Sequence, residues 1–347
     1  GLQMNKQTIK CVVWDLDNTI WDGVLLENSD LKLKPGIEDI IKTLDRRGIL
    51  QSISSKNDHD AAMAALKSFG LDEYFLYPEI NWNAKSYSLA QIQKNLNISM
   101  DAILFIDDQE YELQEVKSVH SSVHCMNACE YRSLLDDPRL IPRFITEDSA
   151  MRRMLYKTDQ LRKQAEAEFN GPSEAFLASL NMRMIIAPAD EHDLQRAEEL
   201  TVRTNQLNAT GKAYSYEELD RLRQSEDHQL LITELEDRFG TYGKIGLALV
   251  HMNETCWRLK MMLMSCRVVS RGVGTVLLTH IMQEAHRAGK PLLADFRDTG
   301  RNRMMNITFR FAGFRDKFTE PDGTMVLEHD LRSIPQFPPY IDVVVQQ

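Results

Sequence analysis

Asp15 and Asp17 directly follow the apolar residues 12–14, and Thr19 stands two positions further along the chain. Because side chains alternate along an extended strand, both carboxylates can point from its end into one pocket. There they can share a divalent cation and a phosphate, with Asp15 as a covalent nucleophile and Asp17 as a general acid and base. The alternative is an acidic turn after a buried strand. The spacing favours phosphoryl chemistry.

The elements around this pair alternate between strands and helices. Amphipathic patterns predict helices and apolar runs predict strands: helices at residues 36–47, 60–69, 86–96 and 110–119, strands at residues 11–15, 49–54, 75–77, 102–106 and 122–125. This order predicts an α/β domain with a mainly parallel sheet and helices on both faces. Ligands of such sheets bind beyond the carboxyl ends of the strands. Residues 54–57 and 107–108 follow such ends, so we expect them to converge with Asp15.

The polar residues at these strand ends complement the two aspartates. A phosphoryl group on Asp15 needs its charge neutralised, and the Ser55 hydroxyl, the Lys85 ammonium and a metal ion can do so. Magnesium requires oxygen ligands, for which the candidates are Asp15, the backbone carbonyl of Asp17 and Asp108, with Asp107 or Glu112 close by. Taken singly, each is also typical of a helix start or a solvated side chain. In combination they predict a phosphoryl site that uses Mg²⁺.

Four motifs of this kind, Asp15-x-Asp17-x-Thr19, Ser55, Lys85 and Asp107-Asp108, resemble those of the haloacid dehalogenase superfamily. The resemblance covers roughly the first 130 residues. It implies that Asp15 forms an aspartyl phosphate, that Asp17 protonates the leaving oxygen and then activates water, and that magnesium bridges carboxylates and phosphate. Residues 20–33 leave no room for a large lid, so we expect a Rossmannoid domain with a minimal cap.

The second half of the chain has a different pattern. Residues 131–180 read as a helical linker between a phosphatase domain at 4–130 and a further domain at 181–347. Within the latter, strands are predicted at 182–186, 230–236, 244–251, 257–264 and 291–295, and helices at 190–202 and 273–288. This is an α+β pattern. The turn before the second helix carries Cys266, Arg267, Arg271, Gly272 and Gly274.

Glycines at a helix N-terminus let a phosphate approach the free backbone amides. This layout resembles the acyl-CoA N-acetyltransferase (GNAT) fold, whose corresponding loop holds the phosphate of coenzyme A or phosphopantetheine. Asn302 and the later Phe309-x-x-x-Gly313-Phe314 fit the same resemblance, with core packing as the alternative. The usual pattern of this fold has Gln or Arg three residues before the first glycine, and Val269 stands at that position. Between positions 258 and 317 there are 12 basic and 4 acidic residues, a local charge of +8 that would attract an acidic partner.

The whole chain resembles the FkbH-like glyceryl transferase/phosphatases of polyketide biosynthesis. The matching segments are residues 10–19, 55–57, 81–86, 203–208 and 265–268. The resemblance implies that a glyceryl unit from 1,3-bisphosphoglycerate is loaded onto the phosphopantetheine thiol of an acyl carrier protein, and that the Asp15 site removes phosphate. The residues expected to bind substrate or phosphopantetheine are Thr19, Asn57, Asn205, Gln206, Arg267, Arg271, Gly272, Gly274 and Asn302.

Cys266 is the candidate acyl carrier within the enzyme. A thiolate can attack an acyl phosphate, and we expect Arg267 and the following helix N-terminus to lower the pKa of this thiol. The alternatives are a small buried hydrophobic residue, and direct attack by the carrier thiol without any enzyme cysteine. His251, at a strand end, is a candidate base, with solvation as the alternative.

Composition limits the classes of function. The chain has 347 residues, 43% of them hydrophobic, and a net charge of -10, which argues against nucleic-acid binding. No apolar run is long enough for a membrane span, and five irregularly spaced cysteines indicate a reducing compartment, the cytoplasm. Two rival functions remain: a small-molecule Mg²⁺-dependent phosphatase with a non-catalytic GNAT-like binding domain, and a carrier-docking module without chemistry.

Overall fold

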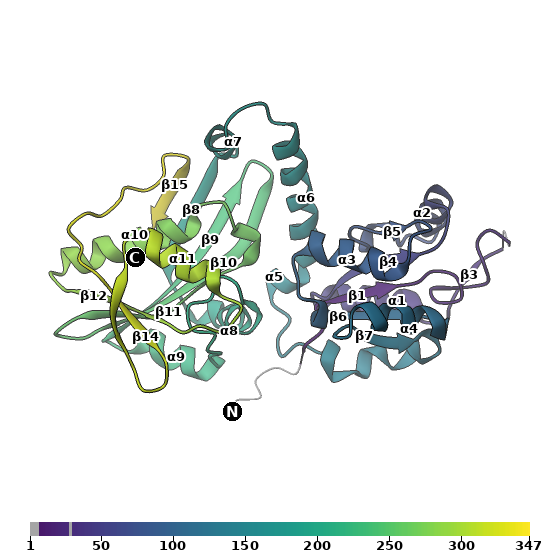
Figure 1. Cartoon of the computed structure of the whole chain (residues 1–347), viewed down its shortest axis with the longest axis horizontal. Helices are drawn as coiled ribbons and strands as arrows, with labels where there is room; N and C mark the ends of the chain where they lie inside the picture. Colours follow the sequence, from purple (N-terminus) through teal and green to yellow (C-terminus); the bar gives the residue numbers. More distant parts are fainter. Residues whose placement is uncertain (1–6, 28–29) are drawn as a thin grey trace. The chain divides into compact units, whose positions relative to one another are not determined.

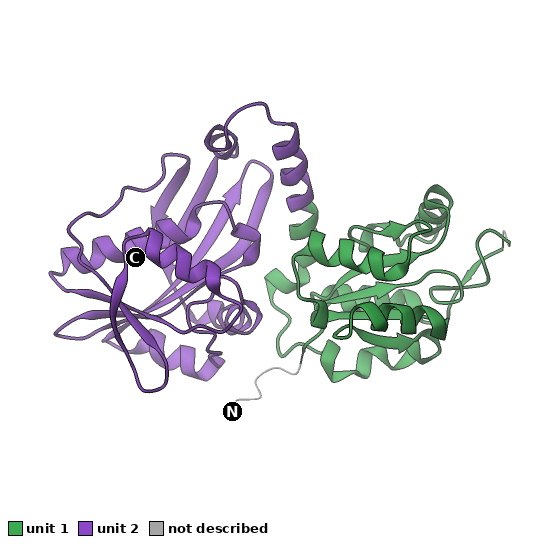
Figure 2. Cartoon of the chain, viewed as in Figure 1, with its two compact units in different colours: residues 1–157 green, residues 158–347 purple. Residues whose placement is uncertain are grey.

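A computed structural model describes residues 7–27 and 30–347 of the chain. It divides into two compact units, Gly1–Lys157 and Thr158–Gln347 (Figure 2). The division falls inside one helix, α6 (Arg152–Glu168). The segment predicted as a helical linker, residues 131–180, therefore contributes to both units, and within it lie α5 (Glu147–Ala150), α6 and α7 (Ser173–Ser179).

The N-terminal unit is built on a five-stranded sheet in the order β5-β4-β1-β6-β7, in which every neighbouring pair is parallel (Figure 1). Its strands are β1 (Cys11–Trp14), β4 (Leu50–Ser55), β5 (Glu79–Ile80), β6 (Ile103–Asp107) and β7 (His124–Asn127). Its longer helices are α1 (Ile37–Arg46), α2 (His59–Ser68), α3 (Lys85–Leu96) and α4 (Glu110–Val119), joined by the 3-10 helices η1 (Asp72–Tyr74), η2 (Met100–Ala102), η3 (Ala128–Asp136) and η4 (Pro138–Leu140).

Alternation along the central strand explains the two layers of helices. Cys11 and Val13 pack with α3 and α4 on one face, whereas Val12 and Trp14 pack with α1 and α2 on the other. All four residues are fully buried, as expected for a strand of a parallel sheet that is covered on both faces. The carboxyl end of β1 thus enters the site from a rigid, fully packed strand.

Two local features of this unit bear on the sequence predictions. Residues 75–77 were expected as a strand, but Tyr77 has a φ of 49° and turns the chain before Pro78, so the edge strand β5 begins only at Glu79. Between β1 and α1 the described residues form only the small ribbon of β2 (Trp21–Asp22) and β3 (Lys32–Leu33). This ribbon agrees with the expectation of a minimal cap.

The C-terminal unit is an eight-stranded mixed sheet in the order β13-β14-β12-β11-β10-β9-β8-β15. Its strands are β8 (Met182–Pro188), β9 (His228–Asp237), β10 (Gly240–Met252), β11 (Trp257–Met264), β12 (Leu292–Phe296), β13 (Arg315–Thr319), β14 (Met325–His329) and β15 (Ile341–Val345). Its helices are α8 (Leu194–Arg203), α9 (Tyr216–Gln224), α10 (Val273–Arg287) and α11 (Arg303–Phe311), with the 3-10 helices η5 (Glu191–Asp193) and η6 (Cys266–Val268).

This sheet too has two packed faces. Met262 and Met264 face the cluster that contains α7, α10 and α11, and Met261 and Leu263 face the cluster of α8 and α9. Asp190 and Asp193 form a capping box that starts η5 and leads into α8. The α+β pattern predicted from the sequence is therefore present.

The sheet opens between two parallel strands. β11 and β12 pair only from Trp257 to Leu259, and beyond that point the space between them is filled by residues 207–209 of the loop between α8 and α9. Ala209 donates its amide to the Met262 carbonyl, and its own carbonyl accepts the Arg297 amide. On the same side, the Met264 amide donates to Leu207 O. A short segment of the chain thus takes the place of a strand between β11 and β12.

In the described ranges 7–27 and 30–347, no helix combines the length and the apolar composition that crossing a bilayer requires.

Candidate active site

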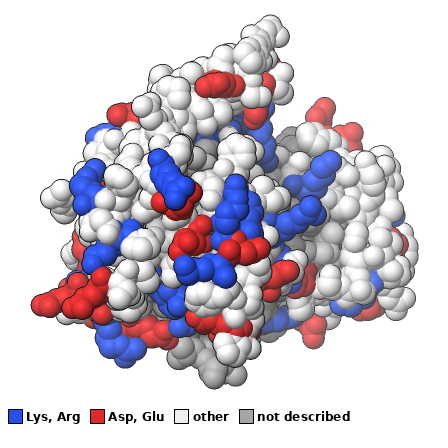
Figure 3. All heavy atoms as spheres, turned by 60° about the vertical axis from the view of Figure 1, so that its left-hand side comes forward, with Lys and Arg blue, Asp and Glu red and all other residues white. Residues whose placement is uncertain are grey.

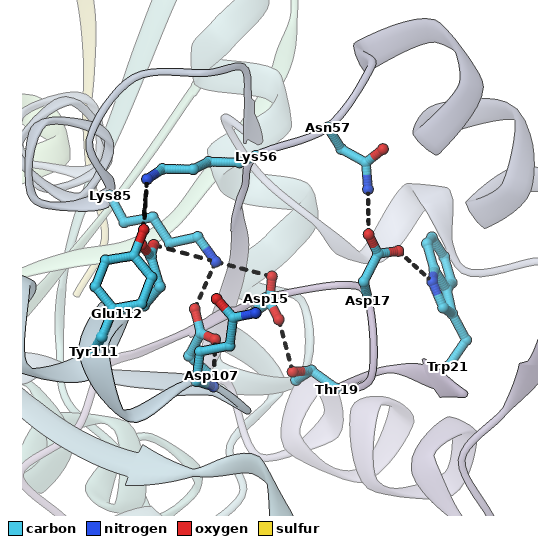
Figure 4. Close-up of polar contacts among 11 residues, drawn as sticks. Asp15, Asp17, Thr19, Trp21, Lys56, Asn57, Lys85, Asp107, Tyr111 and Glu112 are labelled. Atoms are coloured by element: carbon cyan, nitrogen blue, oxygen red, sulfur yellow. Dashed lines mark hydrogen bonds and ion pairs between the residues drawn. The ribbon is translucent and has the colours of Figure 1, made fainter. Parts of the chain in front are cut away.

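Three strand ends of the N-terminal unit meet around Lys85. Its ammonium lies 3.0 Å from Asp15 Oδ1 and 2.5 Å from Asp107 Oδ2, with Glu112 Oε2 at 3.6 Å (Figure 4). Asp15 follows β1, Asp107 ends β6, and Lys85 begins α3, the helix after β5. The side chains of all three are buried. These residues converge at the carboxyl edge of the sheet, as expected.

Asp15 is further fixed by Thr19, whose hydroxyl donates to its Oδ2 at 2.9 Å. Thr19 was expected to bind substrate, and the structure places it directly on the candidate nucleophile. The second oxygen of Asp15 therefore has a defined partner as well, and the carboxylate has one orientation.

Asp17 has its own set of partners. Its Oδ1 accepts hydrogen bonds from Trp21 Nε1 at 2.9 Å and from the Leu25 amide at 3.0 Å, and its Oδ2 accepts one from Asn57 Nδ2 at 3.1 Å. Figure 4 shows this carboxylate turned toward Trp21 and Asn57, away from Lys85. Asn57, expected among the substrate-binding residues, thus holds the candidate acid and base. Trp21 and the Leu25 amide were not singled out by sequence reasoning, because only the β2–β3 ribbon brings them to Asp17.

The site is short of positive charge. Burial raises the pKa of Asp15 to about 7, despite the opposing effect of Lys85, and burial together with the charge of Asp15 raises the pKa of Asp107 to about 6. Burial lowers the pKa of the Lys85 ammonium, but the two carboxylates outweigh this, and its net pKa is raised. Lys85 is therefore charged, and among the described residues it is the one cation that contacts both Asp15 and Asp107.

The residues that could hold a further cation are Asp15, Asp107 and Asp108, which offer oxygens within 4.8 Å of one another. An all-carboxylate donor set with unbalanced negative charge suits a hard divalent ion such as Mg²⁺. Asp15 and Asp108 were predicted ligands and Asp107 a nearby candidate. Asp17 was expected to contribute its backbone carbonyl, and its side chain does not belong to this group.

Ser55 ends β4, the strand next to β1, and is buried at the same edge of the sheet. The following Lys56 lies 3.2 Å from Glu112 Oε1, on α4. Glu112 therefore stands between two lysines. Burial alone would raise its pKa, but a hydrogen bond with the Tyr111 side chain and the charges of Lys85 and Lys56 lower it. Sequence reasoning placed Glu112 only near the metal, and Lys56 was not assigned a role there.

The second candidate site surrounds Cys266 in the C-terminal unit. Cys266 is partly exposed and begins the short helix η6, directly after β11. The two groups expected to activate it are arranged differently from the prediction. Arg267 donates to the Tyr242 carbonyl at 2.8 Å, and α10 begins only at Val273, so its N-terminus does not adjoin the thiol. Cys266 is an accessible thiol at the end of a strand.

Arg271 is buried, and its Nε donates to the Tyr242 hydroxyl at 3.2 Å. The same hydroxyl donates to Asp237 Oδ2 at 2.8 Å, and Asp237 also accepts two bonds from Arg162 of α6. Arg267 and Arg271, the two arginines that were expected to bind a phosphate, are therefore both hydrogen-bonded to Tyr242. Arg267 and Arg271 lie in the turn before α10. Within the described chain, each donates a hydrogen bond to another residue of the protein.

Gly272 and Gly274 lie where α10 starts, as predicted. Gly272 has a φ of 85°, a conformation that strains any residue with a side chain, and a Cβ there would lie 2.6 Å from the Tyr340 hydroxyl, which would have to move. Gly274 is within α10, where a Cβ would lie 3.4 Å from Thr308 Cγ2 of α11. The amides of this first turn are available for an anion in the manner of a helix N-terminus.

Asn302 has a structural role in place of the predicted contact with phosphopantetheine. It is fully buried, and its Nδ2 donates to Asn208 O and to Arg297 O, both at 2.8 Å, while its Oδ1 accepts the Thr299 amide. No polar atom of this side chain is left for a ligand. Asn302 instead fastens the segment 207–209 between β11 and β12.

Asn205 and Gln206 precede that segment on the loop after α8, where Asn205 is exposed. His251, the candidate base, lies at the other end of the sheet. Its neighbour on β11 is Arg258, whereas the strand end that leads to Cys266 pairs with Gly246. The register separates His251 from the thiol by about five residues of strand, or roughly 17 Å, so His251 is not its base.

Comparison with known proteins bears first on the N-terminal unit. Residues 22–120 match the family model of the haloacid dehalogenase-like hydrolases. These residues lie within the N-terminal unit, which therefore resembles this family. None of the curated proteins compared with the chain matches it.

Solved structures resemble parts of the chain. One is the N-terminal part of a Bacteroides fragilis protein containing a phosphatase domain complexed with Mg, with 26% identity over 38% of this chain and a TM-score of 0.34; the match spans only 40% of that chain. Another is the ribosomal-protein-S18-alanine N-acetyltransferase of Escherichia coli, with 16% identity over 44% of this chain and 97% of that one and a TM-score of 0.34. The GNAT domain of S. lividans PAT matches with 19% identity over 41% and 88%, again at 0.34.

The expected fold class is confirmed. The N-terminal unit has the parallel, Rossmannoid sheet that was predicted, and the C-terminal unit is a mixed sheet with helices on both faces, which is the predicted α+β pattern.

Proposed function

We propose that the chain is a bifunctional glyceryl transferase/phosphatase of polyketide biosynthesis, acting in the cytoplasm. It loads a glyceryl unit from 1,3-bisphosphoglycerate onto the phosphopantetheine thiol of an acyl carrier protein, and it removes phosphate at the Asp15 site with Mg²⁺. The observation that carries the phosphatase half is the buried group of Asp15, Lys85 and Asp107 in a domain of the haloacid dehalogenase type. The transferase half is supported by the partly exposed Cys266, which begins the connection between β11 and α10 in a GNAT-like unit.

In the phosphatase reaction Asp15 attacks the phosphorus atom, and the bond between phosphorus and the leaving oxygen breaks. Asp17 donates a proton to that oxygen and then takes one from the water that hydrolyses the aspartyl phosphate. Thr19 fixes one oxygen of Asp15, and Trp21, Asn57 and the Leu25 amide fix Asp17. Lys85 compensates the charge of Asp15 and of the phosphoryl oxygens. Mg²⁺ held by Asp15, Asp107 and Asp108 would supply additional positive charge at these oxygens.

In the transfer reaction the Cys266 thiolate attacks the acyl carbon of 1,3-bisphosphoglycerate. The bond from this carbon to the phosphate oxygen breaks, inorganic phosphate leaves, and a phosphoglyceryl thioester remains on Cys266. The carrier's pantetheine thiolate then attacks the same carbon and releases the Cys266 thiolate. Removal of the second phosphate at Asp15 gives the glyceryl thioester on the carrier. In a shorter variant of this route the carrier thiol attacks the acyl phosphate directly.

The test is mass spectrometry of a holo-acyl carrier protein after incubation with the full chain, Mg²⁺ and 1,3-bisphosphoglycerate. A glyceryl adduct is expected with the unaltered chain, and a phosphoglyceryl adduct with Asp15→Asn. Cys266→Ala should abolish loading if the cysteine is the intermediate carrier; full loading by this variant would establish direct attack instead. Release of phosphate without any gain in carrier mass would refute the transferase half.

A second function is favoured by one observation. Residues 207–209 occupy the gap between β11 and β12, and both arginines of the turn are bonded to Tyr242. A C-terminal unit closed in this way fits a small-molecule phosphatase with a non-catalytic binding domain. That function predicts equal turnover of phosphate esters with and without carrier protein, and equal turnover by Cys266→Ala.

A further inference from the structure

Helix α11 presents an apolar face to solvent. Met304, Ile307 and Phe311 are 40%, 56% and 87% exposed, and their spacing of three and four residues places them on one side of the helix. The opposite side carries Met305 and Phe309, which are buried in the core of the C-terminal unit. We call Met304, Ile307 and Phe311 the α11 face.

The apolar side chains of the α11 face lie outside the hydrophobic cores of the described chain. None of its three side chains belongs to a hydrophobic cluster formed by the described residues, whether buried or partly buried. A phenylalanine exposed to this extent costs hydrophobic free energy that a partner could recover, by about 25 cal/mol for each Å² it covers. Contiguous exposed apolar side chains with a polar rim are typical of an interaction site.

The rim of the α11 face is basic. Arg301 and Arg303 stand at the start of the helix and Arg310 and Arg315 at its end. The nearby acids in sequence are Asp298, before the helix, and Asp316, which pairs with Arg310. Arg303 is exposed and has no ion pair with any residue in the described part of the chain. Figure 3 shows lysine and arginine side chains interspersed with aspartate and glutamate side chains on the side of the molecule that carries the C-terminal unit. The rim calls for an acidic partner, although the chain as a whole is acidic.

The α11 face also adjoins the glycine turn. Thr308 lies between Ile307 and Phe311 in sequence, and its Cγ2 is the atom closest to the position of a Cβ on Gly274, at 3.4 Å. Gly274 belongs to the first turn of α10, whose amides suit a phosphate. A protein seated on the α11 face would thus have its own phosphate-bearing arm within reach of this turn.

We propose that the α11 face is the docking surface for the acyl carrier protein. The partner is an acidic protein whose apolar side chains cover Ile307 and Phe311 and whose carboxylates meet the four arginines of the rim. The arm that carries its thiol then runs past Thr308 to the turn at Gly272 and Gly274. This inference rests on the proposed function, because the carrier is the partner that the transferase requires.

The test compares two acceptors, a holo-acyl carrier protein of a polyketide pathway and free pantetheine. The double variant Ile307→Ser/Phe311→Ser should raise the KM for the holo-carrier about tenfold or more, as expected for the central apolar contacts of an interface. Loading of free pantetheine, which lacks a protein surface, should remain unchanged. Arg303→Glu should lower the association rate with the carrier at low ionic strength, and salt should reduce this effect.

Matched controls use equally exposed residues elsewhere in the same unit. Leu161→Ser on α6 removes an apolar side chain that is as exposed as Ile307, and Arg221→Glu on α9 reverses the charge of an exposed arginine. Neither should alter KM for the carrier. Equal loading of the holo-carrier by the double variant and the unaltered chain would overturn the proposal.

Two further outcomes separate this inference from the proposed function. If the unaltered chain loads neither acceptor, the transferase function is refuted. Calorimetric titration with the holo-carrier then tests the docking surface by itself. Binding that is lost in the double variant supports the docking proposal, and absence of binding to the unaltered chain overturns it. If sedimentation shows a dimer of the unaltered chain that the double variant dissociates, a second copy covers the α11 face, and carrier docking is overturned.

Discussion

Lys85 is the residue on which the charge balance of the N-terminal site depends. Its buried ammonium lies between Asp15 and Asp107, and each of these carboxylates has a raised pKa even with the lysine in place. Removal of one partner from a buried ionic group leaves the opposite charges uncompensated, which is more costly than loss of a surface ion pair.

We therefore expect Lys85→Met to lower the free energy of unfolding of the N-terminal unit by about 3 kcal/mol or more. Urea unfolding followed by the fluorescence of the buried Trp14 and Trp21 would measure it. Lys42→Met is the control, because Lys42 pairs with Glu38 at the surface and its loss should cost about 0.5 kcal/mol or less. An equal loss of unfolding free energy in both variants would contradict the prediction that the buried ion pairs of Lys85 contribute more than a surface ion pair.

Ser54, one residue before the candidate Ser55, has the opposite character. Its hydroxyl is fully buried and has no hydrogen-bond partner among the described residues. An unsatisfied buried hydroxyl costs about 1–3 kcal/mol of desolvation, which its removal recovers. Ser54→Ala should therefore raise the midpoint of thermal unfolding without changing phosphate release. A lower midpoint would indicate a partner, such as a bound water, for this hydroxyl.

Sequence reasoning succeeded at residues whose position follows from the order of strands. Asp15, Ser55 and Asp107 meet because they lie at the carboxyl ends of adjacent parallel strands, and Lys85 because it begins the helix after the edge strand. It could not find Trp21 and the Leu25 amide, which reach Asp17 through the fold of a short ribbon with no periodic signal. It also misjudged Asn302, because a buried asparagine and a ligand-binding one have the same local sequence.

Among the elements, the loop segment 207–209 is held in place largely by one side chain. Asn302 donates to the carbonyl of Asn208, within the segment, and to that of Arg297, directly after β12, and its side chain is fully buried. Further anchorage comes from the backbone pairing of Leu207 and Ala209 with β11 and from the Arg297 amide, which donates to the Ala209 carbonyl.

Asn302→Ala should destabilise the C-terminal unit by about 2–4 kcal/mol, since several buried polar groups lose their partners at once. Hydrogen exchange of the Ala209, Met264 and Arg297 amides should become faster, because these amides form the bonds that hold the segment. The control is Asn306→Ala, one turn later on α11 and only partly buried, which should leave these amides protected. Unchanged exchange in Asn302→Ala would show that the backbone pairing alone is sufficient.

The neighbouring strands β9 and β10 carry a histidine pair next to a carboxylate. The rings of His228 and His251 stack at 4.4 Å, and Asp227 lies 2.9 Å from His228 Nδ1 and 3.2 Å from His251 Nε2. The Ser225 hydroxyl donates to the same carboxylate, and this bond, together with the two histidines, lowers the pKa of Asp227 to about 2.

Because this pKa lies below the ordinary value of about 3.9, the Asp227 carboxylate stabilises the folded state above about pH 4. Its contribution is lost as the pH falls through about 2. Asp227→Asn should therefore lower the thermal midpoint slightly at pH 6, since the site is exposed, and the difference from the unaltered chain should shrink between pH 4 and pH 2. Asp342→Asn, an exposed aspartate on β15, should show no such pH dependence. A difference that is constant with pH would disprove the role of the carboxylate charge.

The whole molecule has separate hydrophobic cores in its two units. Among the residues that the structure describes, two clusters flank the sheet of the N-terminal unit and two flank that of the C-terminal unit, and none of these four contains residues of both units. The sequence predicted two domains from the change in strand and helix order. It could not locate the division within α6, because the charged pattern of residues 152–168 continues without a break.

Calorimetry should accordingly resolve two unfolding transitions, and Mg²⁺ should raise only that of the N-terminal unit. The expected stabilisation is about 2.7 kcal/mol at 100 times the dissociation constant. Asp108→Asn removes one of the grouped oxygens and should abolish the shift, whereas Asp22→Asn, whose exposed side chain pairs with Lys34, should not. A shift of both transitions would show that the cation has a binding site in each unit.

The segment between β11 and β12 has a consequence for affinity. An extended molecule that pairs with the backbone of Met262 and Met264 must compete with residues 207–209, which already use those groups. Its apparent dissociation constant is then the intrinsic one divided by the fraction of molecules in which the segment has withdrawn. Residues 207–209 thus compete, within the same chain, for the backbone groups of β11. The more firmly Asn302 holds this segment, the weaker the apparent affinity for such a ligand becomes.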